Sequence, residues 1–177
     1  MNQIMHFRSL LSLSLLFATV AQASDAGSEG PKALTNEERL QRVAAVHGGS
    51  GPWAVAGFRM GEFVAKTWGV TVPSFDIEVE HRSPAQVQYS CVLDGAAAAT
   101  GASAGKLSLK FIEVPLTIMD TTFRHKPTGR VLTLKLADSF KKKFTDVPRE
   151  KLGSAGAEVL ILADSEIFQV SAGAARK

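Results

Sequence analysis

A glycine-rich turn at residues 48–51, between a histidine and a predicted helix, is the stretch of this sequence best suited to binding chemistry. Its glycines let backbone N–H groups approach a bound group closely, and Pro52 is preset for the first turn of a helix, whose N-terminus favours negative charge. Two cations further along the chain could complete a nest for a carboxylate or phosphate group. The predicted anion-binding residues are Gly48, Gly49, Ser50, Gly51, Arg59 and Lys106. The alternative is an ordinary glycine turn without a ligand.

Cys91 and Asp94 form a second candidate group because their spacing places them on one face of a predicted helix. Cys91 is the only cysteine, so no internal disulfide forms, and its thiol is buried, held by a metal or reactive. Val87 and Ala98 share the face and mark it as inward, so Asp94 is expected to be a buried carboxylate that needs a partner. The candidate partners are Lys106, Arg59, His47 and backbone N–H groups.

Two predicted helices must position the glycine turn. A cap at residue 35 or 36 begins a first helix that ends at His47. A second helix runs from Pro52 to about Trp68, where a glycine follows. A third helix, opened by a proline, covers residues 83–99 and carries the cysteine and its neighbouring carboxylate.

The other segments predict a sheet. The expected strands cover residues 75–80, 107–114, 116–123 and 130–136. The first alternates apolar and acidic residues, which is typical of a half-buried strand, and the other three are expected to form an antiparallel meander. A closing helix over 149–163 and a docking segment over 166–170 follow. This order predicts an α+β fold with helices packed on a mixed, largely antiparallel sheet.

The N-terminus has the features of a cleavable signal peptide over residues 1–23. Arg8 precedes an apolar run at 10–20, which is too short to span a bilayer, and a small-x-small cleavage pattern follows at 21–23. We expect a periplasmic protein without a stable membrane anchor after cleavage. Residues 24–34 are expected to be a flexible leader, and residues 35–172 a single domain.

Composition limits the partners. The net charge of +3 is spread along the chain, apart from three lysines at 141–143, which we expect at a solvated helix end or loop, so nucleic acid is not an expected partner. His81 and His125 are expected in solvated loops without a role. A small molecule or anion is the expected partner, and a homodimer is left open.

Several short motifs together resemble one known family. They are His47-Gly48, Pro52, Gly57-Phe58-Arg59-Met60-Gly61, Cys91-Val-Leu-Asp94-Gly, Thr100-Gly101 and Gly105-Lys106. With this spacing, residues 42–170 resemble the FmdE-like proteins, a family named for one of the subunits of formylmethanofuran dehydrogenase. The resemblance implies an α+β domain related to the catalytic domain of glyceraldehyde-phosphate dehydrogenase.

The chain departs from the family pattern at expected metal ligands. The family motif reads His-Gly-His-x-Cys-Pro-Gly. In this chain Gly49 replaces its second histidine and Gly51 replaces its cysteine. In the family's Thr-Gly-Cys-Thr turn, Ala102 replaces the cysteine. The metal set that the resemblance leaves is His47, Cys91 and Asp94. These residues supply three ligands for a divalent metal such as zinc, with water in the fourth position.

The signal peptide and the resemblance together predict an exported FmdE-like protein that binds a small ligand or a metal, or has an accessory role, with a degenerate metal site. The alternative is a Cys–His enzyme or redox protein in which His47 activates Cys91 and Asp94 orients the histidine. A third interpretation has no ligand: His47 caps its helix or hydrogen-bonds Asp94, and Cys91 is buried. We favour a binding protein over an enzyme, because a buried thiol on an apolar helix face is poorly placed for nucleophilic attack.

Overall fold

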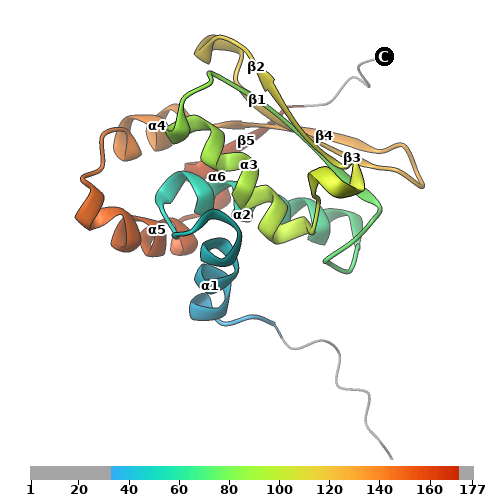
Figure 1. Ribbon diagram of the computed structural model, residues 1–177, viewed down its shortest axis with the longest axis horizontal. Helices are drawn as coiled ribbons and strands as arrows, with labels where there is room; N and C mark the ends of the chain where they lie inside the picture. The colour runs from blue at the N-terminus through green and yellow to red at the C-terminus, as the bar shows by residue number, and fades with distance from the viewer. Residues whose placement is uncertain (1–32, 172–177) are drawn as a thin grey trace, which may run out of the picture. The chain divides into compact units, whose positions relative to one another are not determined.

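The computed structural model describes residues 33–171, which contain six helices packed on a five-stranded mixed sheet (Figure 1). The helices are α1 (Asn36–His47), α2 (Pro52–Trp68), α3 (Val87–Thr100), α4 (Asp138–Phe144), α5 (Leu152–Ile161) and α6 (Asp164–Ile167). The strands are β1 (Ile77–Ser83), β2 (Leu109–Glu113), β3 (Asp120–His125), β4 (Val131–Leu136) and β5 (Phe168–Ser171). The predicted signal peptide and nearly all of the predicted leader lie outside the described residues. Within residues 33–171, no helix is long and apolar enough to cross a membrane.

The first two helices begin and end where the sequence predicts. Thr35 caps α1: its hydroxyl accepts a hydrogen bond from the Glu38 N–H at 3.2 Å, and the Glu38 carboxylate accepts one from the Thr35 N–H at 2.7 Å. Gly48 follows α1 in the left-handed conformation, with a φ of 84°, and Gly69 ends α2 with a φ of 67°. The glycine turn therefore lies between two well-defined helix ends.

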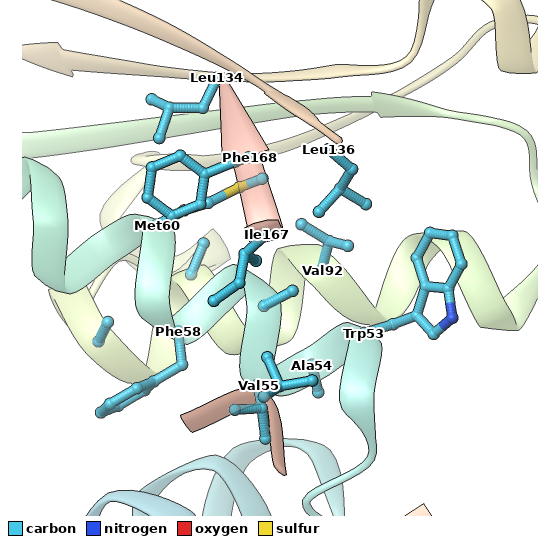
Figure 2. Packing of buried hydrophobic residues seen from close by; sticks show 14 of the residues in the cluster. Trp53, Ala54, Val55, Phe58, Met60, Val92, Leu134, Leu136, Ile167 and Phe168 are labelled. Carbon is cyan, nitrogen blue, oxygen red and sulfur yellow. The ribbon is translucent and has the colours of Figure 1, made fainter. Parts of the chain in front are cut away.

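Helix α2 is the centre of the core, and glycines let α3 pack against its backbone. A Cβ atom added at Gly57 would lie 1.9 Å from the Val92 carbonyl oxygen, and one added at Gly95 would lie 1.7 Å from the Ala54 carbonyl oxygen. Figure 2 shows the side chains that pack around α2, including Val55, Phe58, Met60, Leu134, Leu136, Ile167 and Phe168. The close contact fixes the middle of α3 against the first two turns of α2.

The sheet has the order β2-β1-β3-β4-β5, and only the pair of β1 and β2 is parallel. The predicted meander is therefore wrong for its first strand. β2 pairs with β1, with Val79 opposite Leu109, and α3 forms the crossover that a parallel pair needs. Residues 116–118 form a short 3₁₀ turn instead of starting a strand. β3 and β4 do pair antiparallel, as expected.

Other boundaries differ because pairing and packing extend some elements. β1 continues to Ser83, so α3 begins only at Val87. Val87 is 79% exposed, whereas the sequence predicted that it faces inward. The predicted closing helix begins with a 3₁₀ turn at residues 149–151 before α5. The predicted docking segment forms α6 and β5, and β5 pairs with β4. The lysines at 141–143 lie in the last turn of α4, as expected for a solvated helix end.

Candidate functional site

A pocket of about 300 Å³ lies where the end of α1 and the first turns of α2 and α3 meet the α4–α5 region. Most of its lining is apolar, with a few polar groups, which is typical of small-molecule sites. The lining residues are His47, Gly51, Pro52, Trp53, Ala54, Val87, Gln88, Cys91, Phe144, Val147 and Leu152. His47 and Cys91, two of the three predicted metal ligands, therefore line one pocket.

His47 is held in the pocket wall by Asp94. The imidazole Nδ1 lies 2.8 Å from the Asp94 Oδ2, so His47 is the partner of Asp94 among the four candidates. The prediction that Asp94 is buried is wrong: its side chain is 44% exposed, and that of His47 is 23% exposed. Because Nδ1 faces the carboxylate, the pair fixes the ring orientation and leaves Nε2 as the nitrogen available to a ligand.

Cys91 is half-buried and donates a hydrogen bond from Sγ to the Val87 carbonyl at 2.8 Å. Burial, followed by the nearby Asp94 charge, raises the pKa of the thiol to about 11. A thiol with this pKa stays protonated at neutral pH, whereas a nucleophile acts as the thiolate. In this structure Cys91 therefore acts as a small, weakly polar part of the pocket wall.

The three predicted metal ligands do not form a metal-binding group. Within residues 33–171, no set of three or more His, Cys, Asp and Glu side chains is arranged to hold a metal ion. His47 and Asp94 contact each other directly, and the Cys91 thiol is bonded to a backbone carbonyl. Their chemistry suits zinc, and the zinc site stays a prediction.

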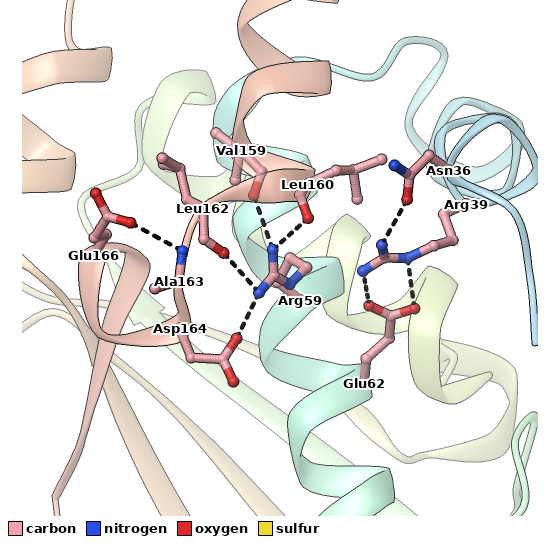
Figure 3. Close-up of polar contacts among 10 residues, drawn as sticks. All are labelled: Asn36, Arg39, Arg59, Glu62, Val159, Leu160, Leu162, Ala163, Asp164 and Glu166. Carbon is pink, nitrogen blue, oxygen red and sulfur yellow. Dashed lines mark hydrogen bonds and ion pairs between the residues drawn. The ribbon is translucent and has the colours of Figure 1, made fainter.

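Arg59 does not reach the glycine turn (Figure 3). Its Nη1 donates to the carbonyls of Val159 and Leu160 at 3.0 and 2.6 Å, and its Nη2 donates to the carbonyl of Leu162 at 3.0 Å. Nη2 also contacts the Asp164 carboxylate at 2.6 Å. The guanidinium therefore caps the C-terminal end of α5, where helix carbonyls lack partners, and is not available to an anion at the turn.

Lys106 also lies apart from the glycine turn. Its Nζ donates to the Gly101 carbonyl at 2.7 Å and lies 4.3 Å from the centre of the Phe75 ring. Gly101 follows the C-terminal end of α3 and Phe75 lies just before β1, whereas the pocket lies at the N-terminal end of α3. The structure thus brings neither predicted cation to residues 48–51.

The glycine turn has structural reasons for its composition. Gly48 occupies a left-handed conformation, and its N–H donates to the Ala44 carbonyl to close α1. The Ser50 carbonyl oxygen faces α5, where a Cβ atom at Gly156 would lie 1.7 Å from it. Of the four residues in the turn, only Gly51 lines the pocket. The turn thus joins two helices and carries the N-cap of α2 to the pocket.

His81 is buried on a strand, so the prediction that it lies in a solvated loop is wrong. It lies on β1, is 1% exposed, and contacts the Thr121 hydroxyl through Nδ1 at 2.8 Å and the Tyr89 carbonyl through Nε2 at 3.0 Å. Desolvation lowers its pKa to about 4, so the ring is neutral at pH 7. Because a carbonyl only accepts, Nε2 carries the proton, and the bond anchors the first turn of α3. Its position two residues after Val79 and four after Ile77, on the inward phase of the strand, was the available signal.

The fold and the pocket define a small α+β domain with a cavity walled by helices. The profile described as FmdE, Molybdenum formylmethanofuran dehydrogenase operon, matches residues 46–169, and the chain belongs to the FmdE family. The match covers His47, Cys91 and Asp94, as the resemblance implied. A search of curated proteins found no match.

Proposed function

We propose that this FmdE-family domain binds a small molecule with a largely apolar body in the pocket between α1, α2 and α3. The observation that carries the proposal is the pocket of about 300 Å³ whose mainly apolar lining includes His47 and Cys91. This volume is at the lower end of the range for small-molecule sites, about 300–1,000 Å³. The apolar walls supply affinity, and the few polar groups orient the ligand.

A binding role agrees better with the side-chain chemistry than catalysis does. The raised pKa of Cys91 disfavours the thiolate that a nucleophilic or redox role requires. His47 is oriented by Asp94 and offers one ring nitrogen to a ligand. The site therefore has a fixed polar group in an apolar wall, which serves recognition without a chemical step.

We also propose that the protein is exported to the periplasm. The support is the apolar run at 10–20 and the cleavage pattern at 21–23, both outside the described residues. Expression of the full chain in a Gram-negative host, followed by intact-mass measurement of the periplasmic fraction, tests this. A chain that begins near Ser24 is expected, and full-length protein in the cytoplasm contradicts export.

Native mass spectrometry and elemental analysis of the cleaved protein test the binding proposal. We expect a small organic ligand retained from the cell, or saturable binding of an aromatic fragment such as toluene seen by NMR. Stoichiometric zinc that Cys91→Ser removes would instead support the predicted metal site.

A matched pair of variants locates the binding. Val87 lines the pocket and is 79% exposed, so Val87→Glu adds a charge at the rim without disturbing the core. Val170 is 46% exposed on β5 and does not line the pocket, so Val170→Glu is the control. Loss of fragment binding in the first variant alone supports the proposal. Equal binding in both variants contradicts it.

A further inference from the structure

We infer that Gly51 determines which ligands the pocket accepts, because its missing side chain leaves room for the apolar end of the ligand. This inference rests on the proposed function and adds the residue that sets specificity at the same site. Gly51 therefore contributes space beside the ligand, whereas the sequence suggested that it contributes a backbone donor for an anion.

The backbone does not require a glycine at residue 51. Gly51 has a φ of −68° and a ψ of 161°, which is extended backbone that other residues adopt readily. Because Pro52 follows, a residue with a side chain would be restricted to this same region. Gly48, three residues earlier in the same turn, differs, since its φ of 84° favours glycine. Conformation therefore explains Gly48 but not Gly51.

Packing and helix capping do not require the glycine either. Among the described residues, apart from its chain neighbours, a Cβ atom added at Gly51 would have one heavy atom within 4 Å, the Leu152 Cδ2 at 3.9 Å, an ordinary van der Waals distance. At Gly57, by contrast, the added Cβ would lie 1.9 Å from a backbone oxygen. Gly51 is also the N-cap of α2, where a serine, aspartate or asparagine side chain would supply the missing cap. The fold would thus tolerate a side chain at residue 51.

The pocket accounts for the glycine. Gly51 and Leu152 both line the cavity of about 300 Å³, so the one neighbour of an added Cβ is itself part of the pocket wall. A longer side chain at residue 51 would extend along that wall and fill part of the cavity. The ligand group that occupies this space lies against the Leu152 side chain, which favours hydrocarbon over polar atoms. The ligand class that follows is a molecule that ends in a bare alkyl group or the edge of an aromatic ring.

Two alkylbenzenes measure how much of the space beside Gly51 a ligand uses. Toluene and propylbenzene differ by two methylene groups, and each methylene that is buried raises affinity about fourfold. Titration of both into the cleaved protein at pH 7, followed by two-dimensional ¹H–¹⁵N NMR, gives the ratio of their affinities. We expect the wild type to prefer propylbenzene about tenfold, because its alkyl chain reaches the space beside Gly51.

A matched pair of glycine variants locates this preference. Gly51→Leu fills the space, so propylbenzene should lose about tenfold in affinity while toluene changes little, and the ratio should approach one. Gly49→Leu is the control. Gly49 lies in the same turn, has no left-handed φ, would have no described atom within 4 Å of an added Cβ, and does not line the pocket. Its variant should keep the wild-type ratio.

Leu152 provides a rescue that a general loss of stability would not produce. Leu152→Ala in the Gly51→Leu background removes the neighbouring wall side chain, which is 37% exposed, and should restore most of the preference for propylbenzene. Gly51→Ala adds a single carbon with room around it, so this variant should fold and should lower the ratio about fourfold. It keeps the test available if Gly51→Leu does not fold.

The outcomes distinguish the two proposals. Failure of the wild type to bind either probe contradicts the proposed function. Equal wild-type affinities for the two probes, or a ratio that Gly51→Leu and Gly51→Ala leave unchanged, overturn the inference and leave the apolar pocket in place. Equal changes in Gly51→Leu and Gly49→Leu overturn it as well, because the effect would then come from the turn as a whole.

Discussion

The imidazole of His47 and the carboxylate of Asp94 lie 2.8 Å apart and join the C-terminal end of α1 to the middle of α3. The contact is partly exposed, so its effect on stability is small, about 1 kcal/mol or less. Its larger effect is geometric, because it fixes which ring nitrogen faces the pocket.

Replacing Asp94 should change the tautomer of His47. In the wild-type protein, the neutral ring carries its proton on Nδ1, toward the carboxylate. Asp94→Ala should increase the fraction with the proton on Nε2, measured by ¹⁵N NMR of the imidazole. The exposed Asp76→Ala is the control, and an unchanged tautomer ratio in Asp94→Ala would show that the carboxylate does not orient the ring.

The neutral, buried His81 should make the protein less stable in acid. Its pKa is lowered from 6.5 to about 4, so below pH 6.5 the unfolded chain binds a proton that the folded chain does not. The free energy of unfolding should decrease as the pH falls from 6.5 to 4, by about 3 kcal/mol from this group. Urea unfolding at several pH values measures the slope. His81→Gln should reduce that slope, and His125→Gln should leave it unchanged.

Adding one methyl group to Gly156 should destabilise the domain. The new Cβ would lie 1.7 Å from the Ser50 carbonyl oxygen, so α5 or the glycine turn must shift, at a cost of about 1–3 kcal/mol. Gly153, in the same helix, has no atom within 4 Å of such a Cβ. Gly153→Ala should therefore stabilise the protein slightly through helix propensity. Thermal unfolding of both variants measures the contrast, and equal melting temperatures would contradict the packing described.

Arg59 should contribute to stability without contributing to ligand binding. Arg59→Met removes three carbonyl contacts and one carboxylate contact at the end of α5, and should lower the free energy of unfolding by about 2 kcal/mol or more. The exposed Arg42→Met should have little effect. Toluene affinity should be the same in the wild type and in folded Arg59→Met. A tenfold loss of ligand affinity in Arg59→Met would show that Arg59 is part of the ligand site.

Cys91 should react slowly with an alkylating reagent. A thiol pKa of about 11 leaves roughly 100-fold less thiolate at pH 7.5 than an ordinary thiol with a pKa of 9.0 has. Iodoacetamide labelling, followed by intact mass, should be slow at pH 7.5 and should accelerate with pH. Urea-unfolded protein is the fast-reacting control. Rapid labelling of the folded protein at pH 7.5 would instead favour the enzymatic alternative.

Local signals in the sequence predicted the helices best. The ends of α1 and α2 follow from a capping box and from glycines, which act within a few residues. The pairing of β2 with β1 was missed because it depends on a crossover through α3, which local periodicity does not encode. The strand that carries His81 was predicted to end at residue 80, because its last residues are polar and their pairing with β2 and β3 is not local.

The candidate site was predictable only in part. The spacing of Cys91 and Asp94 placed both on α3, and the structure selects His47 as the partner of Asp94. The long side chains of Arg59 and Lys106 reach carbonyl groups whose positions depend on tertiary packing.

The contact between α2 and α3 through Gly57 and Gly95 also limits which molecules the pocket accepts. Backbone atoms, not flexible side chains, set the separation of the two helices, so moving the helices apart to admit a larger guest would leave a costly void along their contact. A fitting molecule meets walls that are already in place and loses little of its affinity to reorganisation of the protein. We therefore expect selection by size, with affinity dropping sharply once a ligand outgrows the cavity.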